Sequence, residues 1–183
     1  DLYLKLLEEA VLEEKGEAPA KRRECTADLS VAASIPDRYV PSPEQRMDLY
    51  RRIARIRTSE DADDMTDELI DRFGDPPRTV NNLISVALLR GRAADCAISD
   101  ISQKGMSILF TLDEFDLEHI SQAAGLFPGR VLFSPGDKAV LTLKLKKGED
   151  PLRMASKLVE SYQALIPPEA AKSPGPEGGG GKD

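Results

Sequence analysis

The segment from Ser42 to Pro77 is divided by residues that begin and end helices. Ser42 and Pro43 are the residues preferred at a helix start, because serine can accept a backbone hydrogen bond and proline has no N–H to leave unpaired. Thr58 repeats the start signal, and Gly74 followed by two prolines is typical of a helix end. These signals predict helices over residues 43–57, 60–73 and 78–95.

The first two of these helices carry opposite charge. The first contains five arginines, and the second is rich in aspartate and glutamate. On a helical wheel of residues 60–73, one arc is apolar and is expected to be buried. It consists of Met65, Leu69, Ile70 and Phe73. Asp64, Glu68, Asp71 and Arg72 fall on the opposite side.

Three of these charged residues, Glu68, Asp71 and Arg72, lie close together near the end of the predicted helix. Glu68 lies one turn from both of the others, so a weak Glu68–Arg72 ion pair is expected. Composition alone favours a solvated face. In that interpretation the Glu68–Arg72 ion pair is exposed and contributes only a few tenths of a kcal/mol to stability. The alternative is a surface that binds another protein.

The arginine-rich helix is a candidate nucleic-acid contact through Arg51, Arg52 and Arg55. The whole chain has a formal net charge of −7, however, and affinity for nucleic acid depends mainly on neutralising phosphates. The neighbouring helix is acidic and must pack close by. We therefore expect part of the arginine charge to be neutralised internally and no direct nucleic-acid binding.

The rest of the chain predicts an α+β fold with a helical N-terminal half and a small, mainly antiparallel sheet with two helices. A strand is expected early in the chain, and the later strands alternate with the two helices. The predicted strands are 26–35, 98–102, 106–112, 130–133 and 138–145. The two further helices are 116–125 and 152–165.

We expect three parts in the 183-residue chain. Residues 1–24 are predicted to be a helix and a polar linker that continue from an upstream domain. Residues 25–166 form the α+β domain, and the Gly/Pro-rich residues 167–183 are expected to be a disordered tail. The chain has no apolar run long enough for a membrane span.

No catalytic motif, phosphate loop or metal-ligand spacing is found in the sequence. The one histidine, His119, has no second histidine or cysteine near it, so it is interpreted as an ordinary helix residue. Cys25 and Cys96 are far apart and are expected to be small apolar thiols in a reducing compartment, although a disulfide between them stays open. We therefore predict no catalytic residue, metal or cofactor.

Three segments occurring in order resemble one protein family. They are IPDRYVP (35–41), RMDLYRRIA (46–54) and DELIDRFGDPP (67–77). This pattern resembles the C-terminal domain of the bacterial transcription-repair coupling factor, and the opening DLYLKLLEEAV is similar to the helix that ends the motor of that family. The resemblance is strongest over residues 1–95.

The resemblance implies a parent that is a cytoplasmic, ATP- and Mg-dependent DNA translocase, which removes stalled RNA polymerase and recruits excision repair. It implies that this domain is regulatory and non-catalytic. It would dock on the parent's own UvrB-like N-terminal module and mask the surface that binds UvrA. The resemblance also implies that Glu68, Asp71 and Arg72 make the docking contact, and we call these three residues the docking face.

Overall fold

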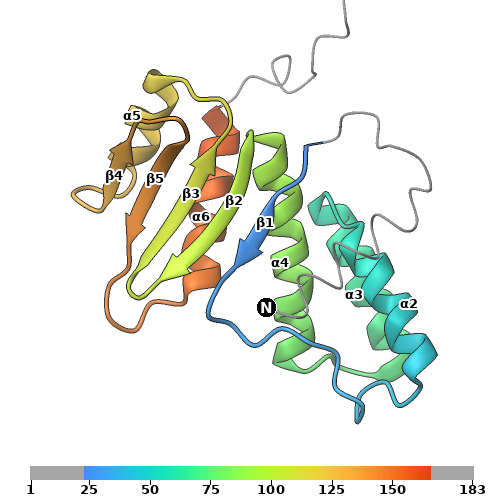
Figure 1. Cartoon of the computed structure of the whole chain (residues 1–183). Coiled ribbons are helices and arrows are strands. Elements are labelled where there is room, and N and C mark those ends of the chain that lie inside the picture. Colours follow the sequence, from blue (N-terminus) through green and yellow to red (C-terminus); the bar gives the residue numbers. More distant parts are fainter. Residues whose placement is uncertain (1–22, 166–183) are drawn as a thin grey trace, which may run out of the picture.

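The computed structural model describes residues 23–165, so the predicted first helix and the tail at 167–183 lie outside the described residues. Figure 1 shows a sheet with helices behind it and a helical subdomain to one side. The elements in chain order are β1 (Thr26–Asp28), α2 (Pro43–Ala54), α3 (Ser59–Phe73), α4 (Arg78–Asp95), β2 (Ile98–Lys104), β3 (Ser107–Leu112), α5 (Leu117–Gly125), β4 (Val131–Ser134), β5 (Ala139–Lys144) and α6 (Pro151–Leu165).

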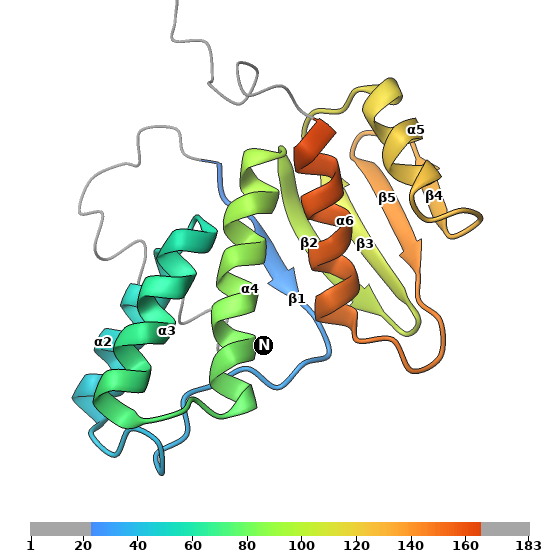
Figure 2. The same ribbon diagram turned by 180° about the vertical axis from the view of Figure 1, so that it is seen from behind.

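The sheet confirms the predicted α+β class. Its five strands have the order β1-β2-β3-β5-β4, with β1 parallel to β2 and every other pair antiparallel. The β2–β3 turn places Gly105 at a φ of 58°, which glycine adopts without a steric penalty. Seen from behind, α4 and α6 cover one face of the sheet, and α2 and α3 lie beside α4 (Figure 2).

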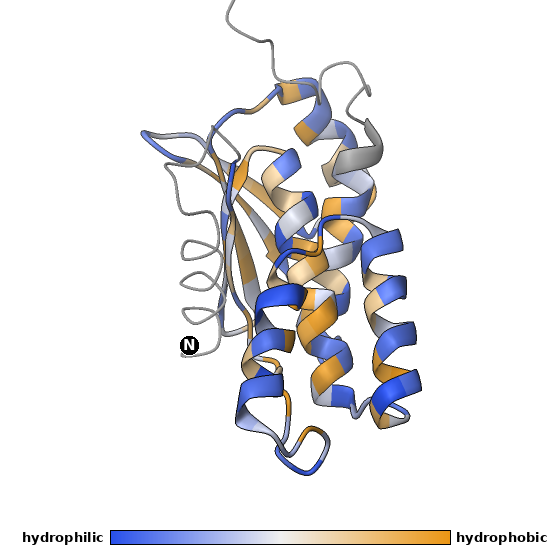
Figure 3. Cartoon of the chain, turned by 90° about the vertical axis from the view of Figure 1, so that its right-hand side faces the viewer, coloured by the Kyte–Doolittle hydropathy of each residue, from blue (hydrophilic) through white to orange (hydrophobic). Residues whose placement is uncertain are grey.

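Helix α4 joins two hydrophobic cores. Its residues Val86 and Leu89 belong to the core between the sheet and α6, whereas Leu83 and Ala87 belong to the core formed with α2 and α3. Nine α4 residues are buried, as expected for a helix that packs against both cores. Figure 3 shows the hydrophilic positions of the helices turned outward. The helical subdomain and the sheet are therefore connected by shared packing and not only by the chain.

The first strand is shorter than predicted. Pairing with β2 ends at Asp28, although the alternating pattern continues to Ile35. Beyond the strand the chain turns toward the helices, where the Ser34 N–H donates to the Thr79 carbonyl at 3.2 Å and the Ile35 N–H donates to the Tyr50 hydroxyl at 2.8 Å. The prediction of a strand over 26–35 was wrong because these helical partners take the backbone hydrogen bonds.

The starts of α2 and α3 are capped as their sequences indicate. The Ser42 hydroxyl accepts from the Gln45 N–H at 3.3 Å. At α3, the Thr58 hydroxyl accepts from the Asp61 N–H, and the Asp61 carboxylate accepts from the Thr58 N–H, which forms a capping box. Helix α2 ends at Ala54, three residues before the predicted end, so the connection to α3 is longer than expected.

Candidate functional site

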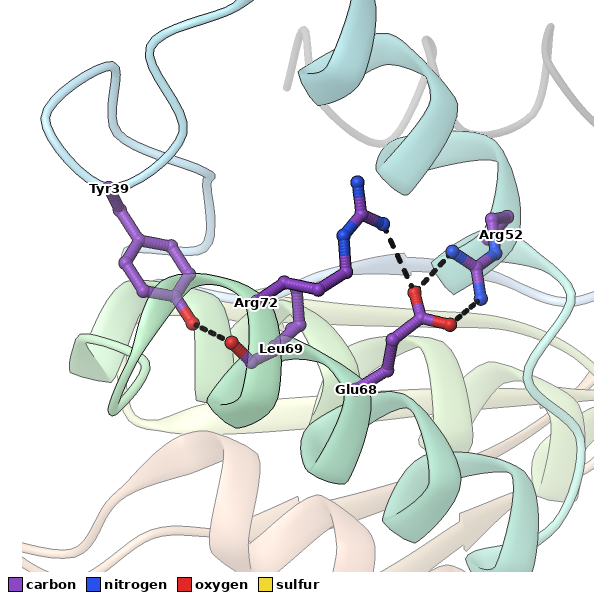
Figure 4. A network of polar contacts seen from close by, with 5 residues as sticks. All are labelled: Tyr39, Arg52, Glu68, Leu69 and Arg72. Carbon is purple, nitrogen blue, oxygen red and sulfur yellow. Dashed lines mark hydrogen bonds and ion pairs between the residues drawn. The ribbon is translucent and has the colours of Figure 1, made fainter.

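Three charged residues from α2 and α3 form one ion network (Figure 4). The guanidinium of Arg52 on α2 binds the Glu68 carboxylate on α3 with two hydrogen bonds, one from Nη1 to Oε2 and one from Nη2 to Oε1 at 2.7 Å. Arg72 Nη1 donates to Glu68 Oε2 at 3.3 Å, one helical turn away. We call Arg52, Glu68 and Arg72 the ion network.

The ion network lies at the surface and not in the core. The side chains of Arg52, Glu68 and Arg72 are 35%, 36% and 40% exposed. The hydrogen bonds from Arg52 lower the pKa of Glu68, and the bond to Glu68 raises the pKa of Arg52. At this exposure, solvent screens the attraction, so the network orders the side chains but adds little stability.

The C-terminal end of α3 is held by an aromatic contact beside the network. The Arg72 guanidinium lies 4.9 Å from the centre of the Phe73 ring, and that ring lies 5.8 Å from the ring of Tyr39. The Tyr39 hydroxyl donates to the carbonyl oxygens of Gly74 at 2.8 Å and Leu69 at 3.3 Å. The bond to Gly74 satisfies a carbonyl just beyond the helix end, and together the two contacts tie Tyr39 to the last turn of α3, so the docking face sits on an ordered part of the helix.

Asp71 differs from the other two residues of the docking face. It is exposed, and within residues 23–165 no side chain binds its carboxylate. Glu68 and Arg72 are brought together, as the spacing predicted, while the Asp71 carboxylate beside them is exposed to solvent. The face therefore combines two fixed side chains with one accessible anion.

A shallow hollow of about 290 Å³ lies between α2 and α3. Arg52 and Glu68 form one end of it, and Arg55 lines it together with acidic residues from the start of α3. This placement supports the expectation that part of the arginine charge is neutralised within the domain. Of the three candidate nucleic-acid contacts, Arg52 is bound by Glu68, Arg55 is exposed at a hollow that Asp61 and Asp64 also line, and Arg51 is half-buried.

The helical wheel was wrong about one residue of the apolar arc. Ile70 is 41% exposed, whereas Ala62 is buried together with Met65 and Leu69. Helix α3 packs on α4 and shares a buried cluster with α2, and Ile70 lies outside the arc that these neighbours cover. Ile70 therefore places an apolar side chain on the exposed surface of α3.

Neither the histidine nor the cysteines form a chemical site. His119 Nδ1 lies 3.9 Å from Asp116 Oδ2, and Cys25 and Cys96 are buried thiols. In the part of the chain that the structure describes, no cluster of His, Cys, Asp and Glu could hold a metal ion. Across the same residues, each helix is too short or too polar to cross a membrane.

Comparison with known proteins identifies relatives of one kind. The family model of the TRCF domain matches residues 29–122. The transcription-repair-coupling factor of Bacillus subtilis (strain 168) is 32% identical over 139 residues, which are 75% of this chain and 11% of that protein. The factor of Staphylococcus haemolyticus (strain JCSC1435) is 30% identical over 167 residues, which are 90% of this chain and 14% of that protein.

The fold has a counterpart among solved structures. A crystal structure of the C-terminal domain of a transcription-repair coupling factor superimposes with a TM-score of 0.71 and 18% sequence identity, and it covers 80% of this chain and 96% of that one. The chain thus spans about a tenth of the length of the curated relatives it matches and nearly all of a separately solved domain.

Proposed function

The chain belongs to the TRCF domain family, and from that premise we propose that it is a regulatory interaction domain of a transcription-repair coupling factor. Residues 25–166 form the docking unit in this proposal. Residues 1–24 continue from the motor of the parent protein, and residues 167–183 are a tail outside the docking unit. The domain supplies protein contacts and no chemistry of its own.

The observation that carries this proposal is the fixed geometry of the docking face. Glu68 is held by Arg72 from the same helix, and the end of α3 is held by Tyr39. A side chain that is already ordered loses less conformational entropy when a partner binds, which favours recognition.

The partner in this proposal is the UvrB-like module at the N-terminus of the parent protein. Docking of α3 on that module covers the surface that recruits UvrA, so repair proteins bind only after release. ATP, magnesium and the contact with RNA polymerase belong to other parts of the parent, which we expect to act in the cytoplasm. No nucleic acid contacts this domain directly.

The contact must be strong enough to form and weak enough to be released. Charged groups across an interface contribute mainly specificity, and removing one partner of a desolvated pair commonly costs a few kcal/mol. The domain exchanges between a docked state and a released state. Activation of the motor can shift this equilibrium only by as much as it favours one of the two states over the other in free energy. A small, half-exposed charged face suits such a switch better than an extended apolar interface.

The alternative function, an accessory DNA-binding domain, receives less support. It requires Arg51, Arg52 and Arg55 to reach phosphates, but the Arg52 guanidinium already binds both oxygens of Glu68. Salt-sensitive binding of duplex DNA by this chain, lost on changing the three arginines, is the result that would favour this alternative.

Charge reversal at Asp71 in the full-length parent protein tests the proposed function. Asp71→Arg changes the docking face without breaking a described contact, so folding is preserved. In a pull-down, we expect the Asp71→Arg variant to retain UvrA, whereas the unaltered parent protein does not. Asp63→Arg is the matched control, because Asp63 is exposed on α3 but lies about 12 Å along the helix axis from Asp71, roughly two turns nearer the helix start. Equal UvrA retention by both variants and the unaltered protein would contradict the proposal.

A further inference from the structure

The Glu68 carboxylate has little hydrogen-bonding capacity left for a partner. A carboxylate offers about four lone-pair sites. Arg52 occupies one site on each oxygen, and Arg72 occupies a second site on Oε2. A partner that binds Glu68 must therefore use the remaining position on Oε1 or replace one of the two guanidinium groups.

The charge of α3 indicates which kind of partner group approaches this face. The helix carries seven carboxylates and a single basic residue, Arg72. The carboxylates are Glu60, Asp61, Asp63, Asp64, Asp67, Glu68 and Asp71. A complementary surface is cationic, because like charges brought together across an interface repel. Such a cationic group and Arg52 would both bind the carboxylate of Glu68.

We propose that Arg52 sets the affinity of the docking face by competing with the partner's cationic group for Glu68. This inference rests on the proposed function for its biological role. Arg52 is a positioning residue here: it acts through Glu68 and has no need to touch the partner. In the free domain it holds the carboxylate, and on docking it must share or release it.

The opposite effect, in which Arg52 helps docking by ordering Glu68, is weaker on this geometry. When Arg52 is removed, Arg72 still binds Glu68 Oε2 from the same helix, so part of the order remains. The part of the Glu68 negative charge that Arg52 neutralises then becomes fully available to the cationic group of the partner. Competition should therefore outweigh preorganisation.

Arg51 provides a matched control on the same helix. It is the neighbouring residue, carries the same charge and is half-buried like Arg52, but it makes no described contact with Glu68. Arg51→Gln and Arg52→Gln change the net charge of the chain equally. A difference between them therefore reports the contact with Glu68 and not the general attraction of a more acidic domain for a cation.

The test measures binding of a hexa-arginine peptide to this chain by calorimetry at low salt, with the site mapped by NMR shifts of the Asp71 and Glu68 amides. We expect Arg52→Gln to bind about two- to fivefold more tightly than Arg51→Gln, the range expected for a half-exposed ion pair. The difference should disappear when Glu68→Gln is added to both. Arg52→Lys, which keeps the charge, should bind like the unaltered chain.

Equal or weaker binding by Arg52→Gln would overturn the inference, as would a difference that persists with Glu68→Gln. Repeating the comparison with the UvrB-like module separates the two proposals. If the peptide shows the Arg52 effect and the module does not bind, the competition stands and the proposed function fails. If the module binds but Arg52→Gln and Arg51→Gln bind it alike, the proposed function stands and the inference fails.

Discussion

At Glu68, one carboxylate connects two helices, and its titration should be visible in the stability of the domain. The bonds from Arg52 lower the pKa of Glu68 below its ordinary value of 4.5. A group with a lowered pKa in the folded state stabilises the fold above its unfolded pKa, and this contribution is lost as the pH falls through the folded pKa.

We therefore predict that Glu68→Gln lowers the free energy of unfolding at neutral pH by less than about 1 kcal/mol, because the pair is half-exposed. The difference from the unaltered chain should shrink as the pH falls below 4.5. Urea denaturation over a pH series measures this. Asp71→Asn is the control, since no described side chain binds Asp71, and it should be nearly neutral throughout. A pH-independent loss in Glu68→Gln would refute the electrostatic explanation.

Cys96 should be chemically silent in the native domain. It is 3% exposed, and burial raises the pKa of its thiol to about 12. Since the thiolate is the reactive form, we expect modification by a disulfide reagent to proceed only through opening of the fold and to accelerate with denaturant. Cys25→Ala isolates the Cys96 signal. Rapid, complete modification of the Cys25→Ala variant in native buffer would contradict the burial of Cys96.

The sequence could predict the contacts of the docking face that lie within one helix. The Glu68–Arg72 pair follows from four-residue spacing, and the structure contains it. The Arg52–Glu68 bond could not be predicted in detail, because it depends on how α2 and α3 cross. Opposite charge on adjacent helices indicated internal pairing, but it did not identify Arg52 as the residue involved.

Among the elements, the passage of α4 beside the α2–α3 connection depends on one glycine. A β-carbon on Gly91 would lie 3.0 Å from Arg57 Cα and 3.1 Å from the Ile56 carbonyl oxygen. These are backbone atoms, so relief requires α4 or the connection to move. We expect Gly91→Ala to destabilise the domain by about 1–3 kcal/mol in thermal or urea unfolding, despite the better helix propensity of alanine.

Gly125 is the matched control for Gly91. It is the last residue of α5, and a β-carbon there would meet no atom within 4 Å. Gly125→Ala should therefore leave stability unchanged or raise it by a few tenths of a kcal/mol. If the two alanine variants had the same stability, the close approach at Gly91 would not limit the packing of α4.

The helix starts were predictable because the signals that set them are local, whereas the end of α2 was placed three residues too late. Ser42, Thr58 and Asp116 each cap the helix that follows. The extent of β1 was not predictable, because the partners that end it, Thr79 and Tyr50, come from helices far along the chain. Local chemistry identifies where an element begins, while tertiary contacts decide how far a strand continues.

For the molecule as a whole, α4 should make the two hydrophobic cores unfold together. Arg92 adds a second connection, since it binds Glu160 of α6 at 2.7 Å and donates to the Ser59 hydroxyl of α3. Leu83 lies in the core that α4 forms with α2 and α3. We expect Leu83→Ala to lower the free energy of unfolding by about 2–5 kcal/mol and to destabilise the core between the sheet and α6 as well. Fluorotyrosine NMR can report Tyr50 and Tyr162, one in each core.

Coincident loss of the Tyr50 and Tyr162 signals in urea, before and after Leu83→Ala, is the predicted result. The sheet-core variant Leu141→Ala should behave in the same way. Two separate transitions would show that α4 does not couple the cores. In that case the docking face could loosen independently of the sheet.

The central claim is that α3 recognises a protein surface through the docking face, and direct binding tests it most simply. The measurement is the affinity of this chain for the UvrB-like module by calorimetry, with Asp71→Arg and Asp63→Arg as paired variants. We predict at least a tenfold loss of affinity for Asp71→Arg, little change for Asp63→Arg, and weaker binding as salt is raised. Binding that is unaffected by Asp71→Arg, or equally weakened by both variants, would contradict the account.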